Sequence, residues 1–396
     1  MKIGIEVQRL FRKKKFGIEI SSLELIKKLR DIEPAHEFVI FAKNDEDRAC
    51  LETSGNVKIK LVAGKMFADF EQFFLPLAVR REGVDILHCT GNTTPYFCSA
   101  PIVQTLHDVI FMDDISETDS YYQRFGNHYR RRMVPIVTPR SEIVITVSEY
   151  EKERIIQRLG IADQKIHVVY NGLDEKRFYP RPYDSHVSVK RKYDLPEDFI
   201  LFLGNASFRK NADRVIEAYV QYSRKSDNPM ALVAPGLTQD FIINKLSKYK
   251  FPFDKQKFIT PGYILDQDLS SIYGLSKIFL FPSISEGFGM PVIEAMACGS
   301  PVITSNTSSM PEIAGNAAIL IDPASASSIA DALLSLSGNE SLRLHKIDKG
   351  FSNATRFNWT ASAEKVLSLY DRVLKRVQNP QTTAAFLRKE YSTSKR

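Results

Sequence analysis

The sequence predicts an α/β protein with two domains, each built around a parallel sheet. Apolar runs of strand length alternate with segments of helical period along most of the chain, which is typical of parallel α/β folds. This series occurs twice, and a stretch with two prolines separates the two occurrences. The length of 396 residues is sufficient for two or three domains, so we expect two similar halves.

The first half contains six predicted strands and one clear helix, over Ser21–Leu29. Each strand-length run stops at a polar residue or a glycine, where a crossover connection would begin. Because these runs alternate with helical segments, we expect a parallel sheet. The predicted strands are Lys2–Val7, Glu37–Ala42, Asp85–Thr90, Pro101–Asp108, Glu142–Ser148 and Lys165–Gly172.

The second half repeats the pattern and ends in two predicted helices, Ala326–Leu336 and Thr360–Val377. A Pro-rich linker, Phe178–Ser185, places the boundary near residue 180. The expected division is therefore domain 1–180, domain 181–358, a C-terminal helix 359–377 that crosses back to the first domain, and a basic tail 378–396. The predicted strands are Phe199–Gly204, Met230–Gly236, Lys257–Tyr263, Lys277–Ser283, Pro301–Ser305 and Ala317–Pro323.

Composition narrows the class of protein further. Hydrophobic residues make up 43% and charged residues 26%, so disorder throughout the chain is not expected. The sequence contains no apolar stretch of membrane-spanning length and opens without a signal-peptide pattern. The four cysteines lack CxxC spacing, which favours a reducing compartment. We therefore expect a cytoplasmic protein.

The positive net charge of +7 is concentrated at the C-terminus. Residues 371–396 hold seven Lys or Arg against two acidic residues, so little excess charge remains for the body of the chain. A nucleic-acid-binding body would need a basic stripe on a folded face, and we expect no nucleic-acid partner. The tail itself is interpreted as a frayed terminus or as a docking segment.

The segment 281–301 carries the strongest chemical signal. A strand runs into a loop with two glycines, and a helix is expected to start near Met290–Pro291, where proline is favoured. Glycines and the free amides of a helix start together attract an anion such as phosphate. Glu286 in the loop and Glu294 in the expected first helical turn would repel a phosphate. They therefore suit the hydroxyl groups of a sugar.

In this segment the chain resembles the retaining nucleotide-sugar glycosyltransferases of family 4, which have the GT-B architecture of two facing Rossmann-like domains. The family motif of two glutamates separated by seven residues matches Glu286 to Ile303, and the resemblance extends over roughly residues 1–375. Further matching segments are Thr105–Val109, Thr146–Ile155, Val168–Phe178, Phe202–Asn211, Ile259–Tyr273 and Ser305–Gly315.

The resemblance implies a role for individual residues. Arg209 and Lys210 would hold the donor pyrophosphate, Glu294 the ribose hydroxyls and Glu286 the transferred sugar. His107 would face the reacting centre from the first domain. Two departures stand out: Gly17 is alone where the family has a Gly-rich loop, and Asn205 follows Gly204 where many members have arginine. Other residues placed at the donor are Gly17, Gly204, Gly262, Tyr263, Phe288, Gly289 and Met290.

The implied activity is transfer of a hexose, with mannose favoured, from a nucleoside-diphosphate sugar to a saccharide or lipid-linked saccharide, with retention of configuration. The two alternatives are a non-catalytic sugar-binding subunit and a nucleotide-sugar epimerase. No obligatory metal is expected, because Arg209 and Lys210 supply the positive charge. Two Asp-x-Asp patterns are not interpreted as metal sites. Asp45–Asp47 is interpreted as part of a solvated loop, and Asp266–Asp268 as the N-cap of a helix starting near Leu269.

Two basic clusters, Leu10–Phe16 and Tyr129–Met133, mix cations with apolar side chains. Either they are solvated loops, or they contact the anionic inner face of a membrane that carries a lipid-linked acceptor. In the second interpretation, Lys13–Lys15 recruit the acceptor or the membrane.

Overall fold

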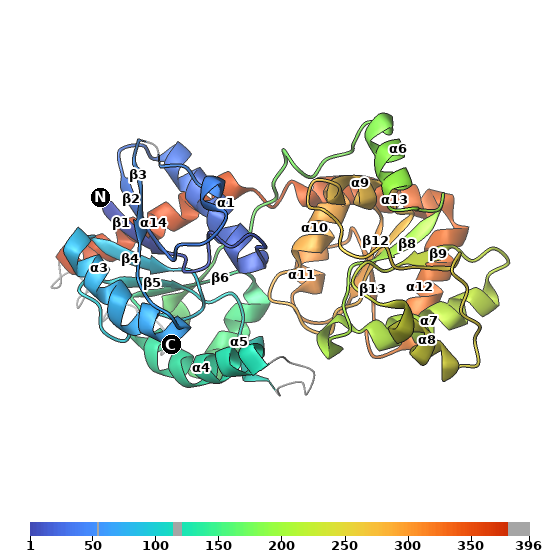
Figure 1. Cartoon of the computed structure of the whole chain (residues 1–396), viewed down its shortest axis with the longest axis horizontal. Helices are drawn as coiled ribbons and strands as arrows, with labels where there is room; N and C mark the ends of the chain where they lie inside the picture. Colours follow the sequence, from blue (N-terminus) through green and yellow to red (C-terminus); the bar gives the residue numbers. More distant parts are fainter. Residues whose placement is uncertain (54, 114–120, 379–396) are drawn as a thin grey trace, which may run out of the picture. The chain divides into compact units, whose positions relative to one another are not determined.

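The computed structural model describes residues 1–53, 55–113 and 121–378, which fold into two compact units (Figure 1). Among these residues, the first unit comprises those up to Gly172 together with 359–378, and the second runs from Leu173 to Asn358. This division comes earlier than the boundary predicted near residue 180. The predicted linker is wrong in part, because helix α6 (Tyr183–Lys192) already begins inside it.

The first unit contains a seven-stranded parallel sheet with the order β3-β2-β1-β4-β5-β6-β7. Helices α1 and α14 pack together against a core that includes Ile3, Ile5 and Phe38, all without exposed surface. The six predicted strands of this half are confirmed, five of them with shorter bounds and Glu37–Ala42 with the predicted bounds. The elements are β1 Lys2–Glu6, α1 Gly17–Ile32, β2 Glu37–Ala42, β3 Val57–Leu61, α2 Phe67–Asp69, α3 Leu75–Glu82, β4 Ile86–Cys89, β5 Ile102–Thr105, α4 Tyr121–Val137, β6 Ile143–Thr146, α5 Glu149–Leu159, β7 Ile166–Val168 and α14 Trp359–Gln378.

Strand β3 was not predicted. It lies at the edge of the sheet, where one side of the strand lacks a neighbour. Its sequence alternates apolar residues with Lys58 and Lys60, and these lysines form ion pairs with Glu37 and Glu82. Charged residues of this kind protect an edge strand against unwanted pairing. They also remove the continuous apolar run that identifies buried strands.

The second unit contains a six-stranded parallel sheet with the order β10-β9-β8-β11-β12-β13. This is the Rossmann order, in which the direction of winding reverses between the first and fourth strands. The α/β prediction and all six predicted strands of this half are confirmed. The elements are β8 Phe199–Phe202, α7 Ala212–Lys225, β9 Ala231–Val233, α8 Gln239–Ser247, β10 Phe258–Ile259, α9 Leu269–Leu275, β11 Ile278–Phe281, α10 Met290–Ala297, β12 Val302–Ser305, α11 Met310–Ala314, β13 Ile319–Ile321, α12 Ala326–Gly338 and α13 Glu340–Ala354.

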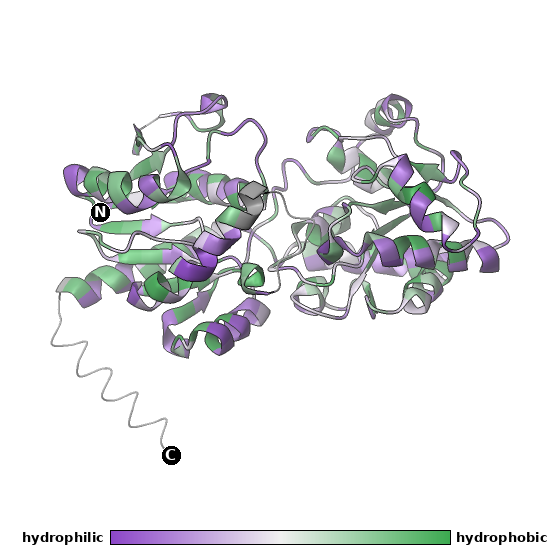
Figure 2. Ribbon diagram, turned by 60° about the horizontal axis from the view of Figure 1, so that its bottom comes forward, coloured by the Kyte–Doolittle hydropathy of each residue, from purple (hydrophilic) through white to green (hydrophobic). Residues whose placement is uncertain are grey.

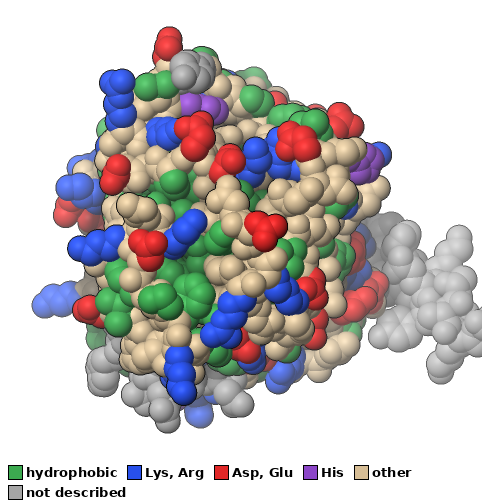
Figure 3. All heavy atoms as spheres, turned by 90° about the vertical axis from the view of Figure 1, so that its right-hand side faces the viewer, with side chains coloured by type: hydrophobic (Ala, Val, Ile, Leu, Met, Phe, Trp, Pro, Cys, Tyr) green, Lys and Arg blue, Asp and Glu red, His purple; other side chains and the backbone are tan. Residues whose placement is uncertain are grey.

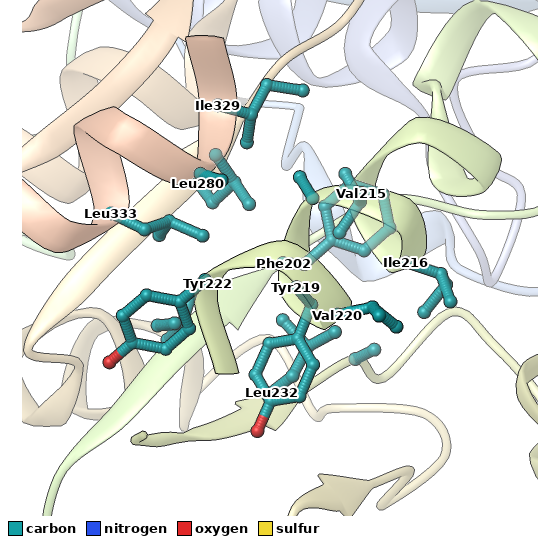
Figure 4. Close-up of a cluster of buried hydrophobic side chains, with 14 of the residues drawn as sticks. Phe202, Val215, Ile216, Tyr219, Val220, Tyr222, Leu232, Leu280, Ile329 and Leu333 are labelled. Carbon is teal, nitrogen blue, oxygen red and sulfur yellow. The ribbon is translucent and has the colours of Figure 1, made fainter. Parts of the chain in front are cut away.

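The core of the second unit lies between the sheet and helices α7 and α12. Figure 4 shows Tyr219 and Tyr222 of α7 together with Leu280 of β11 and Leu333 of α12. Each of these side chains is at most 1% exposed. Tyr219 still satisfies its hydroxyl group, which donates to the carbonyl oxygen of Met230 at 2.8 Å. A buried phenol needs such a partner, so this contact joins α7 to the start of β9.

The helices present mixed surfaces, with apolar and polar residues alternating along the ribbons in Figure 2. This pattern is expected for helices that bury one side against a sheet. On the face shown in Figure 3, Lys and Arg side chains are interspersed with Asp and Glu. Within the described residues, none of the helices combines the length and apolar character needed to cross a bilayer.

Candidate active site

Three of the sequence-predicted residues of the second unit lie where the strand order reverses. Strands β8 and β11 are hydrogen-bonded neighbours, and each is followed by a loop that carries candidate residues. Ligands of open α/β sheets bind at this position, beyond the carboxyl ends of the strands. Arg209 and Lys210 follow β8, and Glu286 follows β11.

The loop after β8 is shaped by a glycine and an asparagine. A Cβ atom on Gly204 would lie 2.0 Å from the Phe202 ring, so no other side chain fits without rearrangement. Asn211 has a left-handed φ of 63°, which asparagine tolerates better than most residues. Its Nδ2 donates to the carbonyl oxygens of Pro282 and Pro323, at 3.0 and 2.8 Å. Asn211 therefore ties this loop to two other strand ends, a role not predicted from the sequence.

Arg209 and Lys210 converge on one carboxylate. Lys210 Nζ lies 2.6 Å from Glu286 Oε1, and Arg209 Nη1 pairs with Glu286 Oε2. Burial acts to raise the pKa of Glu286, but the charges of Lys210 and Arg209 outweigh it and lower that pKa. The carboxylate is therefore ionised at neutral pH. Two cations share one negative charge, so a positive charge remains for an incoming anion.

The loop after β11 is held in place from the opposite side by a serine. Ser309 Oγ lies 2.9 Å from the carbonyl oxygens of both Glu286 and Phe288. Gly289 has a φ of 106°, and a Cβ there would lie 2.3 Å from Met310 Cε. The positive φ favours glycine at this position, and any side chain here would displace the end of the Met310 side chain. Helix α10 starts directly afterwards at Met290, as predicted.

Glu294 differs from the prediction in its position. It is the fifth residue of α10 and so lies in the second turn, not the first. Glu294 Oε2 accepts a hydrogen bond from the Tyr273 hydroxyl at 3.0 Å. Burial raises the pKa of Glu294 to about 7, although Tyr273 and the charge of Arg177 act in the opposite direction. Tyr273 was not singled out as a site residue, because it lies on α9 and no local pattern relates the two positions.

Gly262 and Tyr263 lie in the loop between β10 and α9. Gly262 has a φ of 76°, and the Tyr263 side chain is 61% exposed. Asp268 occupies the N-cap position of α9, as predicted, but its side chain makes no capping hydrogen bond. Its Oδ2 instead accepts from Lys192 Nζ at 2.6 Å and from the Tyr193 hydroxyl at 2.8 Å.

His107 belongs to the first unit and follows β5. Its backbone N–H donates to Asn92 Oδ1 at 2.7 Å, and its Nε2 lies 3.1 Å from the carbonyl oxygen of Thr90. Because a carbonyl oxygen only accepts, Nε2 carries the proton. Burial lowers the pKa of His107 to about 4, so the imidazole is neutral at neutral pH. Its predicted contact with a reacting centre stays a prediction.

Gly17 is the first residue of α1 and is exposed. A Cβ there would meet no atom of the described residues within 4 Å, so packing among these residues does not require glycine at this position. The start of α1 is stabilised instead by Glu19, whose Oε2 accepts from the backbone N–H of Phe16 at 3.0 Å. The predicted donor contact of Gly17 also stays a prediction.

Two family models match the chain. The model of Glycosyltransferase Family 4 matches residues 17–177, and that of Glycosyl transferases group 1 matches residues 188–353. The O-antigen chain mannosyltransferase B of Escherichia coli is 26% identical over 271 residues, which cover 68% of this chain and 69% of that protein. The MMP alpha-(1->4)-mannosyltransferase of Mycolicibacterium hassiacum is 25% identical over 320 residues, covering 76% and 74%. The mannosyltransferase WbdA of Escherichia coli is 26% identical over 250 residues, 62% of this chain but 30% of WbdA.

Solved structures share the architecture. Sucrose-phosphate synthase from Thermosynechococcus elongatus superposes with a TM-score of 0.73 at 18% identity, covering 94% of this chain and 99% of that one. Anabaena Alr3699/HepE, solved in complex with UDP and glucose, superposes with a TM-score of 0.72 at 17% identity, covering 94% and 100%. The fold is thus GT-B, as the resemblance implied. Together with the two family matches, it assigns this chain to the family 4 glycosyltransferases.

Proposed function

We propose that this glycosyltransferase moves a hexose, with mannose as the first candidate, from a nucleoside-diphosphate sugar to a saccharide or lipid-linked saccharide acceptor. The convergence of Arg209 and Lys210 on the Glu286 carboxylate supports this proposal most directly. Cations suit the diphosphate, and an ionised carboxylate suits sugar hydroxyls. The mannosyltransferase names of several relatives favour mannose.

In the proposed reaction, the bond between the anomeric carbon and the diphosphate oxygen breaks while the bond to the acceptor oxygen forms. Negative charge develops on the departing diphosphate, where Arg209 and Lys210 stabilise it. The acceptor proton passes to a phosphate oxygen on the same face of the sugar, which retains the anomeric configuration. In this mechanism, the step requires neither a protein nucleophile nor a metal ion. The neutral His107 orients the sugar by hydrogen bonding.

A panel of nucleotide sugars tests the proposal. The purified protein is incubated with GDP-, UDP- and ADP-hexoses and mannosyl or lipid-linked acceptors, with and without a chelator. Release of nucleoside diphosphate together with formation of a glycoside supports the function. NMR of the anomeric proton of the product shows whether the anomeric configuration of the donor sugar is retained. Binding without turnover would favour a non-catalytic subunit, and isomerisation of the donor sugar would favour an epimerase. Loss of activity in chelator would contradict metal independence.

The pKa of Glu294 predicts that donor affinity falls as the pH drops below about 7. Ribose hydroxyls donate best to the ionised carboxylate, so a bound donor lowers the pKa of Glu294 from its free value of about 7. Affinity should therefore rise with pH and become constant once free Glu294 is ionised. Calorimetric titrations with a nucleotide sugar over a range of pH check this prediction. A nucleotide sugar is suitable because it lacks a terminal phosphate, whose own ionisation at about pH 6 would otherwise contribute to the pH dependence.

Two variants provide the controls for this pH dependence. Glu294→Gln should abolish it and weaken binding about 10-fold at high pH. Tyr273→Phe removes the hydrogen bond that lowers the pKa of Glu294, so the midpoint should move to higher pH. An unchanged pH profile in Glu294→Gln would contradict the assignment.

Peripheral membrane contact forms a further part of the proposal, with one correction. Lys13 and Lys14 are exposed, and Phe16 beside them is 57% exposed. Lys15, in contrast, is largely buried and ion-paired, because its Nζ lies 2.5 Å from Asp47 Oδ2 and its side chain is only 11% exposed. Of the three lysines predicted to contact a membrane, we therefore retain only Lys13 and Lys14.

Vesicle binding should depend on these two lysines. Since a basic residue near an anionic surface contributes about 1 kcal/mol, the double variant Lys13→Ser/Lys14→Ser should bind phosphatidylglycerol vesicles about 10- to 30-fold more weakly. The double variant Lys248→Ser/Lys255→Ser removes the same charge from exposed positions of the second unit and should bind normally. Equal binding by all three proteins in cosedimentation would remove the idea.

A further inference from the structure

The first unit contains a pocket that the donor residues do not explain. It has a volume of about 430 Å³ and lies among the loops that follow β1, β2 and β3, with helix α4 as a further wall. The carboxyl ends of these parallel strands meet at one edge of the sheet, which is where open α/β sheets bind ligands. All its lining residues belong to the first unit.

The pocket walls are basic. Of the thirteen described residues that line the pocket, five are Lys or Arg and one is acidic, the exposed Asp45. The cations come from separate loops and from α4, so no contiguous sequence cluster contains them all. Arg9 is held over the Phe67 ring, with its guanidinium carbon 5.5 Å from the ring centroid. The basic lining residues are Arg9, Arg12, Lys43, Lys65 and Arg130.

A buried amide adds a neutral donor to these cations. Gln8 lines the pocket, although the residue as a whole is only 7% exposed. Its Nε2 has no hydrogen-bond partner among the described residues. A buried amide N–H₂ group without an acceptor is unfavourable, and an oxygen of a bound ligand would satisfy it.

Burial reduces the negative charge of two carboxyl groups near the pocket. Glu6 accepts from the backbone N–H of Gln8 at 2.7 Å, and Glu71 accepts from the hydroxyl of Tyr129, a lining residue, at 2.8 Å. Burial raises the pKa of Glu6 to about 8, assisted by the nearby Glu71, and burial raises the pKa of Glu71 to about 7. Glu6 is therefore largely neutral, and Glu71 is partly neutral, at neutral pH.

Apolar side chains also line the pocket. Met66 is 55% exposed and Phe125 is 43% exposed, and the Phe67 and Tyr129 rings pack edge to face at 5.2 Å between centroids. Cations and an amide donor beside apolar side chains suit an anion attached to a less polar group.

We propose that this pocket binds a phosphate or diphosphate group carried by the acceptor, an inference that rests on the proposed function. The arginines and lysines pair with the phosphate oxygens, and Gln8 Nε2 donates to one of them. The same chemistry occurs in a phosphorylated saccharide and in an isoprenyl diphosphate headgroup, which the experiment distinguishes.

Calorimetric titration of the full chain tests the proposal, with the donor site saturated by the nucleoside diphosphate of the preferred donor. The probes are inorganic pyrophosphate, mannose 1-phosphate and farnesyl diphosphate. The wild type should bind at least one of them, and Arg9→Ser/Arg12→Ser should weaken that binding more than about 10-fold. Gln8→Met should weaken it several-fold. The matched control Arg80→Ser/Arg81→Ser removes two exposed arginines of α3 outside the pocket and should bind as the wild type does.

Thermal unfolding verifies that each variant is folded. If loss of the Arg9 contact with Phe67 destabilises the double variant, the single variant Arg12→Ser takes its place. Tighter binding of farnesyl diphosphate supports a lipid headgroup, and tighter binding of mannose 1-phosphate supports a phosphorylated saccharide. The proposal is overturned if the wild type with a saturated donor site binds none of the three probes. It is also overturned if the control variant loses as much probe affinity as Arg9→Ser/Arg12→Ser. Neither result would affect the outcome of the donor panel. Conversely, the absence of donor turnover would refute the proposed function without affecting pyrophosphate binding that depends on Arg9 and Arg12.

Discussion

Lys210→Ala is expected to lower kcat by about 100- to 1000-fold, the usual effect of removing one preorganised electrostatic donor. The Lys210 side chain is 18% exposed and its ammonium group is fixed 2.6 Å from Glu286 Oε1. Its charge is therefore in place before the diphosphate begins to leave. Because this stabilisation grows as negative charge develops, the loss should appear in kcat rather than in KM. Steady-state kinetics with the preferred donor measure both constants.

The fold should suffer much less from this substitution. Arg209 still pairs with Glu286 in the variant, so the carboxylate keeps a cation, and the loss of unfolding free energy should remain within about 1–3 kcal/mol. The control Lys245→Ala removes a lysine whose Nζ lies 2.5 Å from Asp213 in the same unit, and its kcat should be unchanged. If Lys210→Ala loses activity only in proportion to its unfolded fraction, Lys210 is a structural residue.

The strands could be predicted because most of them are covered on both faces. Ile278–Phe281, for example, is an uninterrupted apolar run and is fully buried. The edge strand Val57–Leu61 escaped prediction because its lysines face solvent and form ion pairs with neighbouring residues. The apolar runs that identified the other strands reflect burial, so a strand with exposed lysines lacks this signal.

The candidate donor residues were predicted where the chemistry is local in sequence. Glu286, Gly289 and Glu294 lie in one loop and the helix that follows it, and Arg209 and Lys210 are adjacent. Tyr273 and Ser309 act on the same segment from other elements, and no short-range pattern relates them to it. The pocket of the first unit was hidden for the same reason, because its cations come from separate loops. Only folding brings these residues together.

Glu286→Gln should affect the sugar and the diphosphate in opposite directions. The substitution keeps the shape of the side chain but removes the negative charge between Arg209 and Lys210. Both cations then act fully on phosphate, and the affinity for free nucleoside diphosphate should rise about fivefold. The sugar hydroxyls lose a charged acceptor and the cations lose the group that positions them, so kcat/KM should fall about 100-fold.

Calorimetry with nucleoside diphosphate and kinetics with the complete donor measure the two effects on the same protein sample. The control Glu217→Gln neutralises a carboxylate that pairs with Arg214 at 2.8 Å on α7, and neither quantity should change in it. If Glu286 had only a structural role, its substitution would weaken the binding of the nucleoside diphosphate and of the complete donor together, since a distorted loop binds neither well. Parallel losses in Glu286→Gln would therefore contradict a sugar-binding carboxylate, whereas opposite changes require a group that attracts hydroxyls and opposes phosphate.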